Sequence, residues 1–120
     1  MTRRTPRELI ELYVEEIWNK GNAELIREVC ADPMVRHEAG KVLELNHDQQ
    51  VERVRKTVAA TQPRFTNLFV VADEDHVATI WNMTGSSEKF PTMSGVEVFR
   101  VRDGRLAECW NHPHVFGHWG

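Results

Sequence analysis

Cysteine is scarce in this sequence, which contains only Cys30 and Cys109. The two residues are far apart in the chain and each lies in an apolar segment, whereas redox and zinc motifs place two cysteines two residues apart. We therefore expect two buried thiols, with a chance disulfide or a reactive thiol as the alternative.

Long apolar runs and an excess of basic charge are also absent. No stretch approaches the roughly 18 consecutive apolar residues of a membrane span, and the start Met1-Thr-Arg-Arg lacks the apolar run of a signal peptide. The formal charge is −3 and its signs are interspersed, so no basic face for phosphate binding is expected. These absences predict a cytoplasmic protein with no membrane partner and no nucleic-acid partner.

The rest of the composition is that of an ordinary globular domain. The chain has 120 residues, of which 41% are apolar and 28% charged, and no repeat or Gly/Ser/Pro linker divides it. A chain of this length suits one core. We predict a single domain over residues 1–120.

The first half of the chain has helical spacing. Thr5-Pro6-Arg7-Glu8 matches a capping box with proline at the first helical position, and predicts a helix that ends at Gly21. A short second helix begins after Asn22 and ends at Asp32-Pro33. A brief strand over 34–37 and a loop around Gly40 follow, and then a third helix over 46–61.

The second half alternates with a period of two residues, which indicates strands over 65–72, 76–84, 92–102 and 105–112. Asp73-Glu74-Asp75 and Asp103-Gly104 are hairpin-like connections, so the pairing should be antiparallel. Helices that precede strands in this way predict an α+β fold. We expect a cone-shaped arrangement of three N-terminal helices on a strongly curved, mostly antiparallel sheet that encloses a pocket.

Alternation along the strand 92–102 places Glu97 on the same face as Gly95 and Phe99. A carboxylate in such a setting must reach a partner, for example an arginine, or stay protonated. We interpret Glu97 as a functional residue, with a structural ion pair as the alternative. Neighbouring strands would add Trp81, Met83 and Asn111 to the same lining, which is typical of a pocket for small molecules.

Four segments resemble the nuclear transport factor 2-like superfamily, and within it the SnoaL-like polyketide cyclases and ketosteroid isomerases. They are Tyr13-Val-Glu-Glu-Ile-Trp18-Asn-Lys-Gly21, Cys30-Ala-Asp32-Pro-Met-Val-Arg-His37-Glu-Ala-Gly40, Gly95-Val-Glu97-Val-Phe99-Arg100-Val-Arg-Asp103-Gly104 and Leu106-Ala-Glu108-Cys-Trp110-Asn111. The resemblance spans nearly the whole chain. It implies the same fold and a pocket for a small organic molecule.

The resemblance to ketosteroid isomerases implies roles for individual residues. Their Asp-x-Phe-Arg motif carries a protonated acid that binds the oxyanion, and Glu97-Val-Phe99-Arg100 falls on it. Their general base falls on His37, whose imidazole suits that task. Their oxyanion tyrosine falls on Tyr13, although alignment on Gly21 selects Val14 instead.

Asn111 falls where limonene-epoxide hydrolases and many SnoaL-like proteins carry an aspartate. An amide can orient a carbonyl but cannot exchange a proton, so this position argues against the epoxide hydrolase mechanism. His112, His114 and His118 could form half of a metal site, although we predict surface or lid roles and no metal. His47 and His76 are expected to be structural.

The sequence thus predicts a cofactor-independent isomerase or cyclase that acts on an apolar, polyketide- or steroid-like carbonyl compound. His37 would remove a proton and Glu97 would bind the oxyanion or return the proton, with Asn111 and Tyr13 in the same catalytic group. The substrate body would lie against Trp18, Trp81, Met83, Phe99 and Trp110. The alternatives are a non-catalytic small-molecule-binding domain and a hydratase or hydrolase that activates water through His37. Val96 and Val98 on the outward face of the sheet predict a homodimer.

Overall fold

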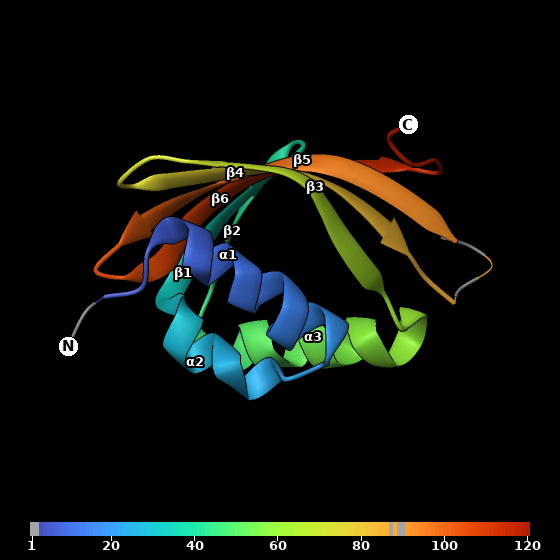
Figure 1. Cartoon of the computed structure of the whole chain (residues 1–120). Coiled ribbons are helices and arrows are strands. Elements are labelled where there is room, and N and C mark those ends of the chain that lie inside the picture. Colours follow the sequence, from blue (N-terminus) through green and yellow to red (C-terminus); the bar gives the residue numbers. More distant parts are fainter. Residues whose placement is uncertain (1–2, 87, 89–90) are drawn as a thin grey trace.

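A computed structural model describes residues 3–86, 88 and 91–120 of the chain. Six strands form one curved sheet in the order β2-β1-β6-β5-β4-β3, and the helices lie against one face of it (Figure 1). This arrangement confirms the expected α+β fold with helices packed on a mostly antiparallel sheet. No helix in the described part of the chain is long and apolar enough to cross a membrane.

The four C-terminal strands agree with the period-two pattern of the sequence. They are β3 (Arg64–Ala72), β4 (His76–Thr84), β5 (Thr92–Arg102) and β6 (Arg105–Val115). Each pairs with the next in antiparallel register. The hairpin connection at Asp103 and Gly104 has positive φ at both residues, which glycine adopts readily.

The N-terminal helices cover the concave face of this sheet. The helix α1 (Pro6–Leu12) starts at the predicted capping box of Thr5 and Glu8 and continues as the π-helix η1 (Tyr13–Asn19). A 3-10 turn, η2 (Ala23–Leu25), precedes α2 (Ile26–Val29). The second helix is therefore shorter than predicted, because the chain enters a strand at Cys30 and not after Pro33.

The first two strands differ from the sequence prediction. β1 (Cys30–Glu38) is longer than the brief strand expected at 34–37, and β2 (Lys41–Leu45) replaces part of the expected loop. β1 pairs with β2 in antiparallel register and with β6 in parallel register. This parallel pairing brings the motif around His37 next to the motif around Trp110.

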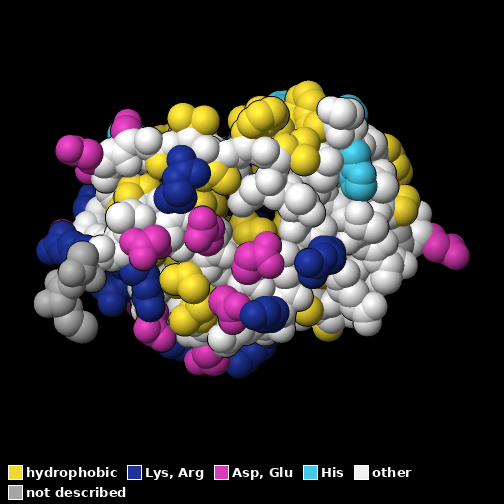
Figure 2. Space-filling view, viewed as in Figure 1, with side chains coloured by type: hydrophobic (Ala, Val, Ile, Leu, Met, Phe, Trp, Pro, Cys, Tyr) yellow, Lys and Arg dark blue, Asp and Glu magenta, His cyan; other side chains and the backbone are white. Residues whose placement is uncertain are grey.

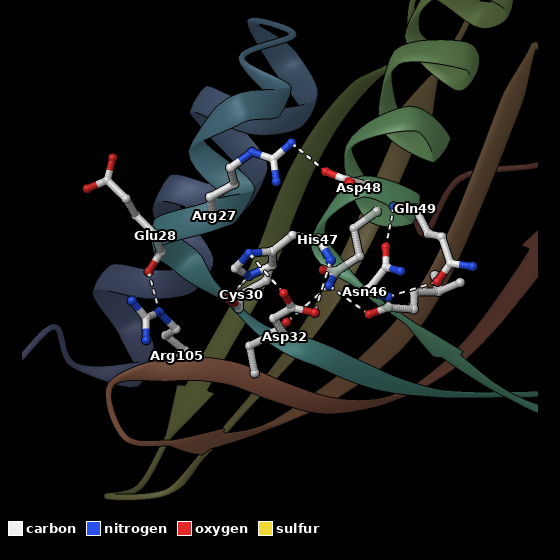
Figure 3. Close-up of polar contacts among 12 residues, drawn as sticks. Arg27, Glu28, Cys30, Asp32, Asn46, His47, Asp48, Gln49 and Arg105 are labelled. Carbon is white, nitrogen blue, oxygen red and sulfur yellow. Dashed lines mark hydrogen bonds and ion pairs between the residues drawn. The ribbon is translucent and has the colours of Figure 1, made fainter.

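A polar network joins α2, β1 and the third helix, α3 (His47–Thr61) (Figure 3). Asn46 caps α3 together with Gln49. The His47 ring lies 2.8 Å from the carbonyl oxygen of Cys30, and Arg27 pairs with Asp48 at 2.9 Å. His47 therefore has the structural role that the sequence predicted.

The hydrophobic core lies between the helix layer and the sheet. It includes Leu9, Ile10, Ile17, Phe99 and Leu106, each at most 1% exposed. Cys30 and Cys109 are free, and both side chains are buried in this core. Burial raises the pKa of each thiol to about 12, and the prediction of two buried thiols is confirmed.

Candidate functional site

A cavity of about 590 Å³ lies between the helix layer and the concave face of the sheet. Its walls are largely apolar, and the helices α1, η1 and α3 face the strands β3, β4, β5 and β6 across it. The aromatic and thioether lining comes from Tyr13, Trp18, Phe65, Trp81, Met83 and Met93. A cavity of this size and lining is typical of a site for a small organic molecule.

Glu97 lies in this cavity on β5, and its side chain is 13% exposed. Arg36 Nη2 on β1 donates to Glu97 Oε2 at 3.1 Å. Burial raises the pKa of the Glu97 carboxyl, and the Arg36 guanidinium opposes that rise. A buried carboxyl with a specific charge partner in a cavity is a candidate functional group.

Tyr13 and Arg36 form a buried polar pair in the cavity wall. Arg36 Nη1 donates to Tyr13 Oη at 3.4 Å, and Tyr13 is 6% exposed. Burial raises the pKa of the Tyr13 phenol, so the hydroxyl stays protonated and can donate a hydrogen bond. The sequence alignment left open whether Tyr13 or Val14 takes the position of the oxyanion tyrosine. Both residues line the cavity, and only Tyr13 carries a hydroxyl.

Two buried polar atoms at the cavity have no hydrogen-bond partner among the described residues. They are Trp81 Nε1, a donor, and Asn111 Oδ1, an acceptor. Asn111 lies directly opposite Glu97 in the β5 and β6 pairing. A buried polar atom without a partner is costly, so a ligand with both an acceptor and a donor would stabilise this part of the site.

The Trp81 indole depends on a glycine. A Cβ atom built at Gly95, its partner across β4 and β5, would lie 2.4 Å from Trp81 Cζ2. Only a residue without a side chain leaves room for the Trp81 ring at this position. Gly95 therefore allows Trp81 to lie where it lines the cavity.

His37 lies on the opposite face of the sheet, so the expectation that it meets Glu97 in one cavity is wrong. Its ring stacks on Trp110 at 5.0 Å between centroids, and its Nε2 lies 2.6 Å from Glu108 Oε2. In β1 successive side chains alternate between faces, and Arg36 is the residue that faces the cavity. His37 therefore has no access to a ligand held beside Glu97, which also removes the mechanism in which His37 activates water there.

Two of the expected substrate contacts are also placed elsewhere. Phe99 is 0% exposed in the core, where its ring lies 5.4 Å from that of Tyr13. Trp110 belongs to the outer face, where the Arg100 guanidinium lies 5.2 Å from its ring centroid. Trp18, Trp81 and Met83 do line the cavity with Glu97, Asn111 and Tyr13, and their contacts with a substrate stay a prediction.

The C-terminal segment lies against β4. Within residues 3–86, 88 and 91–120, no group of three or more His, Cys, Asp and Glu side chains is placed to hold a metal ion. His118 Nε2 instead lies 3.0 Å from the carbonyl oxygen of Met83, and the Trp119 amide donates to Asn82 at 2.8 Å. These contacts hold the C-terminal segment against β4.

Sequence reasoning missed Arg36 and Arg53, the two arginines of the cavity. Arg36 lies two residues after Met34 in a strand, and Met34 is 1% exposed. Period-two alternation from a buried methionine would have placed Arg36 on the inner face. Arg53 lies on α3 two residues after the buried Val51 and one before Val54, and it gave no separate signal.

Comparison with known proteins gives one family and many similar structures. A sequence profile described as the SnoaL-like domain matches residues 10–109. No curated protein sequence matches the chain. The similar structures include a candidate polyketide cyclase from Acidithiobacillus ferrooxidans, with 26% identity, a TM-score of 0.78, and coverage of 94% of this chain and 91% of that chain.

Two further structures extend the likeness. IdmH, a candidate polyketide cyclase from Streptomyces antibioticus, has 26% identity, a TM-score of 0.72 and coverage of 92% of each chain. An epoxide hydrolase from M. tuberculosis has 14% identity, a TM-score of 0.75, and coverage of 88% of this chain and 80% of that chain. At that identity the second likeness concerns the fold alone.

Proposed function

The chain belongs to the family of SnoaL-like domains, and from that premise we propose that it is a cofactor-independent enzyme that transfers protons on an apolar carbonyl compound. The observation that carries the proposal is a buried carboxyl, Glu97, whose pKa is raised by burial inside a largely apolar cavity. A general base or acid works best when its pKa lies near the working pH. The reaction is an isomerisation or an intramolecular cyclisation.

The proposed reaction uses Glu97 as the residue that moves the proton. Its carboxylate takes a proton from the carbon next to the carbonyl, and the C–H electron pair moves to give an enolate with its charge on oxygen. In an isomerisation the proton returns to another carbon. In a cyclisation the enolate carbon attacks a second carbonyl of the same molecule, and the proton goes to the new alkoxide.

Arg36 and Tyr13 supply the hydrogen bonds that the enolate needs. Both are buried residues of the cavity wall, Arg36 Nη1 lies 3.4 Å from Tyr13 Oη, and Arg36 also contacts Glu97. Fixed donors aimed at a developing oxyanion act strongly where water is excluded. Asn111 Oδ1 and Trp81 Nε1 would orient the polar groups of the substrate, since neither has a partner among the described residues.

The two candidate polyketide cyclases at 26% identity favour the cyclase form of this reaction. The second candidate function is a non-catalytic binding domain, because this cavity suits a ligand whether or not it is converted. The test is exchange of the protons next to the carbonyl of 2-tetralone in heavy water, followed by proton NMR. We expect the protein to accelerate this exchange above the rate in buffer. If 2-tetralone binds without faster exchange, the enzymatic proposal is refuted and the non-catalytic binding domain is favoured.

We further propose that two copies associate through the outer face of the sheet. Exposed apolar side chains gather there from several strands, and Figure 2 shows hydrophobic groups along the side of the molecule where the sheet lies. Val42, Phe69, Val71 and Val96 are between 38% and 67% exposed. Apolar side chains exposed on one face of a sheet favour an interface with another protein surface.

The charges of the outer face favour an identical partner. Glu108 Oε1 accepts from Arg100 Nη1 at 2.9 Å, and Glu108 Oε2 lies 2.6 Å from the His37 ring. Because these charges pair within one copy, two such faces can meet across a two-fold axis without like-charge repulsion.

Substitution Val96→Arg tests this interface. An arginine there would place two like charges in the buried centre of a symmetric interface, so we expect the wild type to sediment as a dimer at micromolar concentration and the variant as a monomer. Sedimentation velocity measures both species. A wild type that sediments as a monomer throughout that range would contradict the proposal.

A further inference from the structure

The charges that line the cavity do not balance. Three cationic side chains, Arg36, Lys41 and Arg53, face two acidic ones, Glu38 and Glu97. Both acidic side chains contact the same cation, since Arg36 lies 3.1 Å from Glu97 and 3.4 Å from Glu38. Neither Arg53 nor Lys41 lies within ion-pair distance of a described carboxylate, although the charge of Arg53 reaches Glu97 across the cavity and acts to lower its pKa.

Arg53 lies beside the aromatic part of the cavity. Its guanidinium carbon lies 5.6 Å from the ring centroid of Trp18, and the residue is half-buried. No carboxylate of residues 3–86, 88 and 91–120 lies within ion-pair distance of it. The Trp18 ring attracts the charge but supplies no lone pair, so the N–H donors of Arg53 stay available.

Arg55, on the same helix, is an arginine that does not line the cavity, and it serves as a comparison for Arg53. Its side chain is 61% exposed and its Nη2 lies 2.9 Å from Glu24 Oε2. The two arginines are separated by one residue on the same helix, yet Arg55 has a carboxylate partner and Arg53 has none among the described residues. Position on the helix therefore decides which of them can receive an anion from a ligand.

We propose that the substrate is an apolar, ring-containing molecule that carries a carboxylate, and that Arg53 binds this carboxylate. The planar guanidinium matches a carboxylate in two parallel hydrogen bonds. The apolar body lies against Trp18, Phe65 and Met83, which line the same cavity. The inference deepens the proposed function, on which it rests, by naming the class of substrate.

Arg53 lies on α3, whereas the paired Glu97 and Arg36 lie on β5 and β1. In this proposal a carboxylate held by Arg53 orients the molecule with respect to Glu97, Tyr13 and Arg36. Lys41 at the exposed rim adds a second positive charge that attracts the anion.

Calorimetric titration with 2-naphthoate and 2-naphthamide tests this inference, because the two probes have nearly the same shape and differ in charge. We expect the wild type to bind the naphthoate at least about tenfold more tightly, in line with a charge-assisted pair of hydrogen bonds. Arg53→Gln should lose that preference and keep its affinity for the amide within about twofold. Arg53→Lys should keep part of the preference, since it retains the charge without the planar fork.

Arg55→Gln is the matched control, and it should leave the binding of both probes unchanged. A wild type without preference for the naphthoate, an Arg53→Gln variant that retains the preference, or no binding of either probe would overturn the inference. The outcome is separable from the proposed function. Naphthoate preference without 2-tetralone exchange would refute the enzyme alone, and exchange without the preference would refute the role of Arg53 alone.

Discussion

Glu97→Gln should lower the rate of 2-tetralone proton exchange about 10²- to 10⁴-fold, the usual loss when a general acid or base is removed. The amide keeps the shape of the side chain in the cavity but cannot take up or return a proton. Proton NMR in heavy water measures the rate directly. Circular dichroism of the variant shows whether the fold is kept.

His37→Ala is the control for this result, because His37 was the base that the sequence predicted. Its ring stacks on Trp110 on the outer face and does not line the cavity. We expect this variant to exchange the protons of 2-tetralone within about twofold of the wild-type rate, against the 10²-fold or greater loss for a true base. A large loss with His37→Ala together with full activity of Glu97→Gln would reverse the assignment.

Arg36→Met should destabilise the protein by about 3–5 kcal/mol, the cost of leaving one member of a buried ion pair without its partner. Arg36 is 3% exposed, and it contacts Glu97, Glu38 and Tyr13. Methionine fills much of the same space but leaves the Glu97 carboxylate uncompensated. Urea unfolding followed by circular dichroism measures the difference in free energy of unfolding.

The loss of stability in Arg36→Met should grow with pH. Burial raises the pKa of folded Glu97 above its ordinary value, and Arg36 opposes that rise, so the variant raises the pKa further. A carboxyl whose pKa is higher in the folded state than in the unfolded state binds more protons when folded, and stability falls as pH rises through that window. In the variant, the pH range over which stability falls extends to higher pH. The difference in free energy of unfolding between wild type and variant is therefore larger at pH 8 than at pH 5.

The double variant Arg36→Met with Glu97→Gln separates the charge from the packing. Without the carboxylate there is no uncompensated charge, so the extra loss of stability at pH 8 should disappear. A double variant that shows the same pH dependence as Arg36→Met would assign that dependence to another group. The pairwise coupling of the two residues follows from the four proteins together.

The C-terminal half of the fold could be predicted because its strands alternate clearly. In β4 the buried residues Val77, Thr79, Trp81 and Met83 recur at every second position. The SnoaL-like match over residues 10–109 likewise confirms the resemblance drawn from four short segments. Local patterns and motif order were sufficient for these parts.

β2 could not be predicted because none of its side chains is fully buried. Its residues are exposed or half-buried, and Val42 is 63% exposed. A strand at the edge of a sheet with no buried face gives no period-two signal. The hydrogen bonds to β1, which only the folded chain supplies, make it a strand.

The candidate site depends on which side chains of β1 point into the cavity. The sequence alone left this orientation ambiguous. Met34 and Val35 are both apolar, so hydrophobicity does not decide which of them points inward. Placing Val35 inward brings His37 into the cavity, and placing Met34 inward brings Arg36. The structure takes the second arrangement, with Met34 1% exposed, because β1 is held in register beside β6, where Arg36 pairs with Cys109 and His37 with Trp110.

The titration of Glu97 by carbon-13 NMR, in protein labelled at the glutamate carboxyl and assigned with Glu97→Gln, tests most directly whether this buried group is the one that carries protons. The account predicts a pKa above the ordinary glutamate value of about 4.3, because burial outweighs the nearby guanidinium. A pKa below that value would mean a purely structural ion pair, and it would contradict the account.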